Sequence, residues 1–317
     1  METFRIVDYA RLVTDSVPNP VRRKWSGHLS RRGAGILAAV FAVAVSLVSA
    51  PAAAANPPAA VNSAAQGECV PTAEHPTPVV LVHGTWATAE ATWPAMTQAL
   101  DDAGLCVYSF EFGDARTGTT NMLGLPGGAD IRRSAADFAA FVDDVRARTG
   151  SEQVDVVGHS QGGLVARAYL RFEGGADPVH PENTAVRRLV TLGTPHHGTS
   201  FGDVQVLGAI AELLGAPVVP AAAAVVGPSY IQQMSGSPFL NELNAGGDTE
   251  AGVDYTVVAS RDDRVASPPE RGFLAPNPDA TVRNVWVQDE CPGAYVDHAM
   301  LTTDPCTVGI VTDALRR

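Results

Sequence analysis

Short apolar runs alternate along the chain with stretches of helical length. The apolar runs lie at residues 79–82, 106–111, 154–157, 188–192, 255–259 and 282–287. A continuous run of this length is typical of a strand that is buried on both faces of a sheet. Strands that alternate with helices favour a mainly parallel sheet with helices on both of its faces. The pattern therefore predicts an α/β fold.

The stretches between these runs are expected to form helices, at about 92–103, 130–150, 161–172 and 307–315. The second is the best defined, because Asp130 is a typical N-cap residue and Gly150 a typical stop. Its apolar residues recur at helical spacing and form one face: Ile131, Phe138, Phe141, Val142 and Val145. The glycine-rich stretch 113–128 is expected to be a loop.

The alternation lapses between residues 201 and 248. The segments 204–214 and 218–226 are strongly apolar and weakly patterned, with Gly215 and Pro217 between them. One interpretation is a helical cap that packs permanently on the upper edge of the sheet. The other is a mobile lid that exposes an apolar mouth. The sequence predicts a domain at 78–317 with a cap or lid insertion at about 201–248.

The first 55 residues have the three-part layout of a secretory signal peptide. Small residues fill 49–55 after the apolar run 36–48, and both follow a group of basic residues: Arg22, Arg23, Lys24, Arg31 and Arg32. We expect cleavage near Ala53–Ala55, a flexible tail at 56–77 and a secreted protein. Arg31 and Arg32 also permit export by the twin-arginine route. The alternative is an uncleaved membrane anchor, but the apolar run is short for a span of about 20 residues.

The charge of the sequence excludes one class of partner. The 317 residues have a formal net charge of −12. The first 55 hold seven of the 22 basic and three of the 34 acidic residues, so the remainder has a net charge of −16. So acidic a protein is poorly suited to nucleic acid or to an anionic membrane surface. We expect no nucleic-acid partner, and a monomer.

Four cysteines lie outside the leader: Cys69, Cys106, Cys291 and Cys306. An even number in an exported protein suggests disulfides, with three possible connectivities. We favour pairing of 69 with 106 and of 291 with 306, because each pair would close a local loop. No C-x-x-C motif occurs and no histidine has zinc-ligand spacing from a cysteine, so no metal site is expected.

Residues 154–163 predict the most informative local structure of the chain. A buried strand ends at Gly158, Ser160 follows, and a helix starts at once. G-x-S-x-G at such a turn is the pattern of the nucleophile elbow in α/β-hydrolases. Small residues at 158 and 162 are required because bulk there would collide with the neighbouring strand or helix. By itself, the pattern also fits an ordinary strand–loop–helix corner.

A nucleophilic serine needs a base that a carboxylate orients, and the expected order along the chain is serine, acid, histidine. His298 follows the last predicted strand and is the one histidine that follows both other members. Asp262 and Asp263 follow the strand at 255–259. Adjacent side chains face different ways, so one of them at most is expected to meet His298, and we favour Asp263.

The remaining histidines have other expected functions. His83, His196 and His197 are expected to make structural hydrogen bonds. The side chain of His159 is expected to point away from that of Ser160. His75 and His180 lie in polar segments and are expected to be exposed to solvent.

The tetrahedral intermediate of acyl transfer needs two backbone N–H donors for its oxyanion. The residue after the nucleophile, Gln161, is expected to supply one of them. The loop after the first strand supplies the other, from Thr85 or, as second choice, from Trp86. Gly84 allows the backbone of this loop to turn inward.

Five motifs in this order resemble those of the secreted bacterial α/β-hydrolase lipases and esterases, the class 2 lipase group and its actinobacterial relatives. They are the oxyanion strand PVVLVHG at 78–84, the elbow GHSQGG at 158–163, LGTPHHG at 192–198, DRV at 263–265 and DH at 297–298. The resemblance covers about residues 78–315. It implies an α/β-hydrolase fold and ester hydrolysis without a cofactor, with Ser160, Asp263 and His298 as triad and Thr85 and Gln161 as oxyanion donors. Some such lipases carry a structural calcium ion, but the sequence has no obvious carboxylate cluster for one.

The sequence therefore predicts a secreted serine hydrolase that cleaves carboxylic esters, most simply a triacylglycerol lipase with transient contact to a lipid interface. A short-chain esterase or a polyester hydrolase is the alternative within the same chemistry. An acyltransferase would use the same triad. A catalytically silent surface binding protein is the alternative from another class, but such proteins usually lack a triad residue and here all three are present.

Overall fold

A computed structural model describes residues 69–113, 124–201 and 218–317. The chain divides into two compact units, and the sheet belongs to the unit of residues 57–202 and 220–317. Of the other unit, residues 1–56 and 203–219, the structure describes Val218 and Val219. The predicted signal peptide and the apolar segment 204–214 lie outside the described residues, as does most of the predicted loop at 113–128.

Six parallel strands form the sheet in the order β2-β1-β3-β4-β5-β6. The strands are β1 (Val79–Val82), β2 (Val107–Phe110), β3 (Val154–His159), β4 (Val186–Leu192), β5 (Asp254–Ala259) and β6 (Thr281–Trp286). Each strand begins and ends within two residues of the apolar run that predicted it. The chain leaves β1 towards one edge of the sheet and returns to the other side of β1 at β3. The carboxyl ends of β1 and β3 therefore meet at the point where the strand order reverses, which is where open α/β sheets bind ligands.

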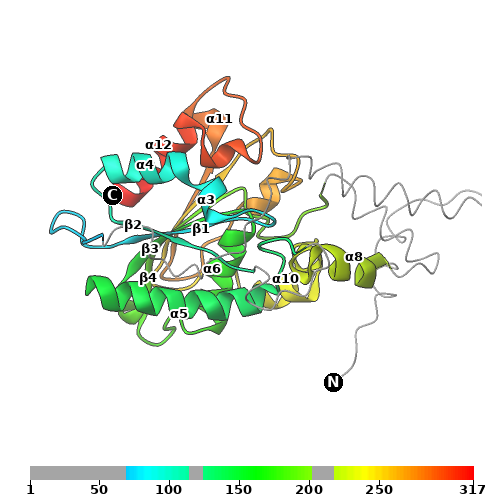
Figure 1. Cartoon of the computed structure of the whole chain (residues 1–317), viewed down its shortest axis with the longest axis horizontal. Coiled ribbons are helices and arrows are strands. Elements are labelled where there is room, and N and C mark those ends of the chain that lie inside the picture. The colour runs from blue at the N-terminus through cyan, green and yellow to red at the C-terminus, as the bar shows by residue number, and fades with distance from the viewer. Residues whose placement is uncertain (1–68, 114–123, 202–217) are drawn as a thin grey trace, which may run out of the picture. The chain divides into compact units, whose positions relative to one another are not determined.

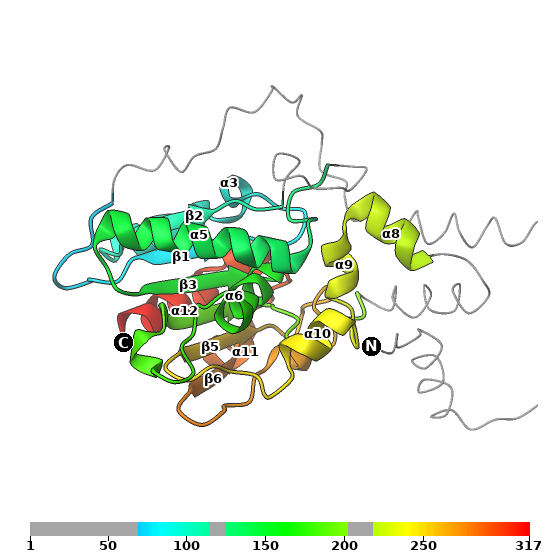
Figure 2. The same cartoon turned by 90° about the horizontal axis from the view of Figure 1, so that it is seen from below.

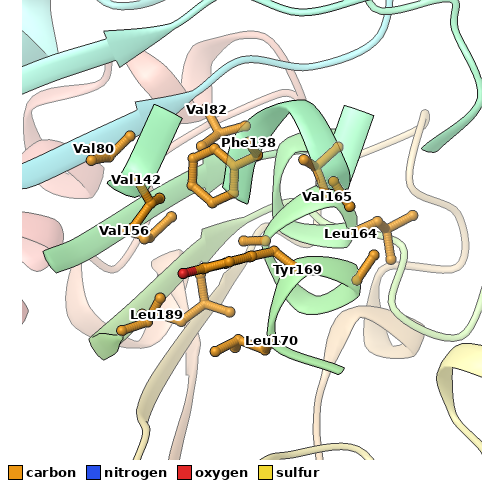
Figure 3. Packing of buried hydrophobic residues seen from close by; sticks show 14 of the residues in the cluster. Val80, Val82, Phe138, Val142, Val156, Leu164, Val165, Tyr169, Leu170 and Leu189 are labelled. Atoms are coloured by element: carbon orange, nitrogen blue, oxygen red, sulfur yellow. The ribbon is translucent and has the colours of Figure 1, made fainter. Parts of the chain in front are cut away.

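Helices cover both faces of the sheet (Figure 1). On one face lie α5 (Ile131–Thr149) and α6 (Gln161–Phe172), and on the other lie α4 (Pro94–Asp102) and α12 (Pro305–Arg316). Val80 and Val82 point towards α5 and α6, where Phe138, Val165 and Tyr169 meet them (Figure 3). Because Val79 and Leu81 point to the opposite face, β1 is apolar at every position.

Helix α5 begins and ends where the sequence predicts. The Asp130 carboxylate accepts hydrogen bonds from the N–H groups of Arg132 and Arg133. Gly150 follows the last turn with a φ of 69°, a left-handed conformation that glycine adopts at little cost. The helix predicted at 92–103 is α4, and a separate short helix, α3 (Ala89–Thr92), precedes it. The two are separate because Pro94 lacks an N–H group and therefore begins a new helix.

The remaining elements are short. In the predicted cap region the structure describes α8 (Val218–Val226), α9 (Pro228–Gln232) and α10 (Pro238–Leu243), and α9 and α10 lie beyond one end of the strands (Figure 2). The other short helices are α11 (Val287–Glu290) and the 3-10 turns Pro181–Asn183, Pro269–Gly272 and Met300–Thr302. Within the described ranges, no helix combines the length and the apolar character that a membrane crossing requires.

Both predicted disulfides are confirmed. Cys69 is bonded to Cys106 and Cys291 to Cys306, with Cα–Cα distances of 5.5 and 6.4 Å. The first bond joins the start of the described chain to the residue before β2, and the Tyr108 hydroxyl donates to the Cys69 carbonyl. The second encloses the loop that carries His298.

Candidate active site

Ser160 occupies a strained turn between β3 and α6. Its φ is 54° and its ψ −124°, values that a non-glycine residue adopts only when its surroundings enforce them. The surroundings are tight. A Cβ atom on Gly162 would lie 2.1 Å from the Val82 carbonyl oxygen, and one on Gly158 would lie 2.6 Å from the Gly163 nitrogen. The steric requirement predicted for positions 158 and 162 is confirmed.

A buried carboxylate holds the candidate base. His298 Nδ1 donates to Asp263 Oδ2 over 2.7 Å, and Asp263 Oδ1 accepts from the N–H groups of Val265 and Ala266. Burial alone would raise the pKa of Asp263, but the hydrogen bond from His298 and the charge of that ring, with the two backbone bonds, lower it below its ordinary value. The Asp263 carboxylate is therefore ionised at neutral pH and suited to fix the orientation of the imidazole.

The three residues lie at the same edge of the sheet. The Ser160 N–H donates to the Leu192 carbonyl, so the elbow lies beside the end of β4. A Cβ atom on the next residue, Gly193, would lie 3.0 Å from Asp263 Oδ2 and 3.1 Å from His298 Nδ1. His159 Nε2 donates to the His298 carbonyl over 3.0 Å, which joins the elbow directly to the histidine loop.

Asp262, the neighbouring acid, faces away from the imidazole as predicted. Asp262 Oδ2 accepts from the Val296 N–H and from Gln288 Nε2, while the Ser260 hydroxyl donates to the Val296 carbonyl. The backbone two residues before His298 is thus fixed at both its N–H and its C=O. Sequence reasoning missed this function of Asp262, because its partner is a backbone group on another loop.

The loop after β1 lies against the elbow. A Cβ atom on Gly84 would lie 3.0 Å from Ser160 Cβ, so the loop backbone approaches as closely as glycine allows. The Trp86 N–H donates to the Pro126 carbonyl over 2.8 Å and is engaged there. Among the described residues, the backbone N–H groups of Thr85 and Gln161 have no hydrogen-bond partner. Of the two predicted choices in this loop, Thr85 is therefore the available donor.

The side chains of these two residues are bonded to each other. The Thr85 hydroxyl donates to Gln161 Oε1 over 2.6 Å and accepts from Gln233 Nε2 over 2.8 Å. Gln161 and Gln233 are 0% and 1% exposed. No feature of the sequence singled out Gln233, because a glutamine in an apolar segment without periodicity gives no signal of its partner.

Two further histidines support the site as structural groups. His83 Nδ1 donates to the Gly84 carbonyl over 2.9 Å, and the His83 ring stacks on Phe112 at 4.3 Å, so it orders its loop as predicted. Burial, with the charge of His298, lowers the pKa of His159 to about 3. His159 is therefore neutral and carries its proton on Nε2, where it donates to the His298 carbonyl.

The adjacent pair after β4 divides into a buried and a partly exposed histidine. His196 is fully buried beside Thr191, and burial with the charge of Arg167 lowers its pKa well below the ordinary value. His197 lies between the Asp248 carboxylate and the Arg271 carbonyl, each 3.0 Å from one of its nitrogens. The hydrogen bond to Asp248 raises the pKa of His197 against the effect of burial. Both make structural hydrogen bonds, as predicted.

Three aromatic rings stack beside the loop after β1. Tyr230 of α9 stacks on Trp86 with a centroid distance of 5.6 Å and on Phe201 at 4.4 Å. All three are partly exposed. Among the residues that the structure describes, no group of three or more His, Cys, Asp or Glu side chains could hold a metal ion. The described residues thus present apolar rings beside the polar groups of the candidate site.

The chain is similar to proteins of one known family. The family model described as "Lipase (class 2)" matches residues 76–272. A triacylglycerol lipase of Pseudarthrobacter phenanthrenivorans is 31% identical over 131 residues, which are 40% of this chain and 35% of that protein. The chain thus spans about a third of the length of the curated relative that it matches.

Two solved structures show the fold. Aspergillus fumigatus lipase B has a TM-score of 0.57 at 21% identity, over 78% of this chain and 55% of that one. Bacillus licheniformis lipase BlEst2 in its mature form has a TM-score of 0.51 at 18% identity, over 77% and 94%. The predicted α/β-hydrolase fold is confirmed.

Proposed function

This chain belongs to the class 2 lipase family, and we propose that it hydrolyses carboxylic esters as a triacylglycerol lipase. The observation that carries the proposal is the hydrogen bond between His298 and the ionised Asp263, beside a serine held in a strained turn at the head of a helix. A strained elbow that presents one serine to a carboxylate-bound histidine is built for nucleophilic catalysis.

In the proposed reaction, Ser160 Oγ attacks the ester carbonyl carbon while His298 Nε2 accepts the hydroxyl proton. Asp263 stabilises the imidazolium through Nδ1. The electron pair of the broken C=O π bond moves to the carbonyl oxygen, where the N–H groups of Thr85 and Gln161 stabilise the charge. Collapse of the intermediate expels the alcohol, which takes the proton from His298, and water then releases the acid by the same steps in reverse.

The proposed substrate is an ester with an apolar acyl chain. The partly exposed rings of Trp86, Phe201 and Tyr230 support this choice, because they offer apolar surface beside the oxyanion loop. We further propose that the region 201–248 is a cap or lid insertion in the domain, and that the protein makes transient contact with a lipid interface. Rates on esters of increasing acyl length, ending with emulsified triacylglycerol, test this. A maximum at acetate or butyrate without activity on the emulsion would favour a short-chain esterase instead.

The serine is tested by Ser160→Ala. This variant should lose ester hydrolysis and labelling by a serine-directed phosphonate while it unfolds in urea like the wild type. Ser151→Ala is the matched control, because Ser151 precedes β3 and lies at the opposite end of that strand. Retained hydrolysis in Ser160→Ala would refute the mechanism. An added alcohol that captures the acyl group better than water would show an acyltransferase.

We also propose that the protein is exported after cleavage near Ala53–Ala55. Two disulfides support an oxidising destination. N-terminal sequencing of the protein from culture medium tests the cleavage site. Export that fails when Arg31 and Arg32 are both replaced by lysine would indicate the twin-arginine route.

A further inference from the structure

Three side chains connect the candidate oxyanion hole to the segment that follows α9. Gln233 donates to Thr85, and Thr85 donates to Gln161. Thr85 and Gln161 are the two residues whose backbone N–H groups are available for an oxyanion. Their side-chain bond of 2.6 Å therefore couples the positions of the two donors. Both glutamines are buried, so each amide depends on these hydrogen bonds in place of bonds to water.

The direction of this chain of hydrogen bonds is fixed at Gln233. Gln233 Nε2 also donates to the Ser229 carbonyl over 3.1 Å, so the NH2 side of the amide faces Thr85. A hydroxyl has one proton, and since Thr85 Oγ1 accepts from Gln233, its own proton is directed to Gln161 Oε1. Gln161 Nε2 has no partner in the described part of the chain, so the bond from Thr85 is the one that holds this amide.

Ser229, whose carbonyl accepts from Gln233, is itself linked to the loop after β1. The Ser229 hydroxyl donates to the Gly127 carbonyl, and the Pro126 carbonyl accepts from the Trp86 N–H. A Cβ atom on Gly127 would lie 2.8 Å from the Gly84 carbonyl oxygen, so the backbones are in close contact. The Gln233 carbonyl accepts from the Thr199 N–H over 3.0 Å. Gln233 is thus held both at its side-chain amide and at its backbone carbonyl.

We propose that Gln233 is a positioning residue for the oxyanion hole and acts through the Thr85 side chain. The inference rests on the proposed function. Without the Gln233 amide, the Thr85 hydroxyl is free to rotate and the Gln161 amide loses its defined partner. The two backbone donors then lose the spacing that the oxyanion requires.

The expected effect is on the chemical step. Loss of one oxyanion donor lowers kcat by about 10²- to 10³-fold in serine hydrolases, and displaced donors should cost less, about 10- to 100-fold. The donors act on charge that develops in the transition state, so KM should change by less than about twofold. Gln233→Leu tests this with a side chain of similar size and no donor.

The neighbouring residue provides a matched control. Gln232 Nε2 donates to Asp130 Oδ2 over 2.7 Å, and Gln232 Oε1 accepts from the Ile131 N–H over 2.8 Å. Gln232 therefore fixes the same helix to the start of α5, and these side-chain hydrogen bonds do not involve Thr85 or Gln161. Gln232→Leu should lower stability in urea but leave kcat within about twofold of the wild type, since it removes structural bonds alone.

A double-mutant cycle with Thr85 locates the effect. We measure kcat and KM on a soluble aryl ester, the rate of phosphonate inactivation, and urea unfolding. Thr85→Val should lower kcat as Gln233→Leu does, and Gln233→Leu should have no further effect in the Thr85→Val background. Thr85→Ser, which keeps the hydroxyl, should retain most of the activity.

Two results would overturn the inference: equal kcat values for Gln233→Leu and Gln232→Leu, or an undiminished effect of Gln233→Leu when residue 85 is valine. If Gln233→Leu does not fold, equal kcat values for Thr85→Val and Thr85→Ser would overturn it instead. A wild type without ester hydrolysis would refute the proposed function and the inference together. An active wild type with equal variants would refute the inference alone.

Discussion

Replacement of glycine by alanine is expected to have different effects at three positions. The positions differ in the space for an added Cβ atom and in the backbone φ angle. Gly162 has no room: a Cβ atom would lie 2.1 Å from the Val82 oxygen and 2.7 Å from the His83 oxygen. Gly150 has room, with no atom within 4 Å, but its φ is 69°. Gly309 lies inside α12 and has both room and an ordinary φ.

Alanine at position 162 should destabilise the fold and damage the site together. Overpacking costs about 1–3 kcal/mol, and here the atoms in the way belong to the backbone at the end of β1, which cannot turn aside like a side chain. The displaced backbone leads directly to Thr85. A shift of about 1 Å in a catalytic group can cost about 10²-fold in rate, so kcat should fall by at least about 10-fold.

The other two substitutions act on stability alone. Gly150→Ala should cost about 1 kcal/mol because alanine is strained in the left-handed region. Gly309→Ala should stabilise by about 0.5–1 kcal/mol because it restricts the unfolded chain inside a helix. Urea unfolding with a constant slope measures these differences, and ester hydrolysis measures kcat. If Gly162→Ala kept wild-type stability and kcat, the close approach of α6 to β1 would not be what requires glycine in the elbow.

Three further predictions concern pH and covalent links. The pKa values of His159 and His196 are lowered in the fold, so below about pH 6.5 the unfolded chain binds more protons than the folded one. The free energy of unfolding should therefore be highest above that pH and fall as the pH decreases, by up to about 1.4 kcal/mol per pH unit for each residue. Urea unfolding between pH 7 and pH 5 measures this. The pKa of His197 is raised, so the effect of pH is reversed: its pairing with Asp248 stabilises the fold below about pH 6.5 and is lost as the pH rises through the folded pKa. His197→Gln should therefore lower the free energy of unfolding more at pH 6 than at pH 9, by at most about 1 kcal/mol for a partly exposed pair. An equal loss at both pH values would contradict this. Replacing Cys291 and Cys306 by alanine opens a loop with a sequence separation of 15, which should cost about 3 kcal/mol in urea and lower kcat, because that loop carries the candidate base.

The sequence predicted the sheet because its strands are buried on both faces. Each strand then appears as an apolar run, and the intervening helices have periodic faces and marked ends, as Asp130 and Gly150 do for α5. The order of the candidate triad was also predictable, since Ser160, Asp263 and His298 each follow a strand and the carboxyl ends of parallel strands meet at one edge. These are properties of segments, and a segment can be recognised without its partner.

Contacts between segments could not be predicted from the sequence in this way. Asp262 binds the backbone of Val296, and Gln233 binds the hydroxyl of Thr85, so in each pair the relevant partner has no sequence signature of its own. The pairing depends on how the loops approach one another after the sheet has formed. The sequence could limit Asp262 and Asp263 to one triad acid, but it could not give the other a function.

Backbone strain marks positions where the fold holds a residue in a conformation that its residue type disfavours. Among the described residues, four that are not glycine have positive φ: Trp86, Ser160, Phe201 and Asp279. The first three follow β1, β3 and β4 at their carboxyl ends, and each costs of order 1–3 kcal/mol that the surrounding packing must offset. The strain at Ser160 presents the nucleophile. Trp86 and Phe201 both stack on Tyr230, so the strained residues of the two outer loops meet on the helix that precedes Gln233. Helix α9 therefore carries Tyr230, on which the aromatic surface offered to the substrate is built, and Gln233, the residue proposed to position the oxyanion donors, follows it directly. Substrate contact at α9 and catalysis at Ser160 would thus be sensitive to the same few hydrogen bonds.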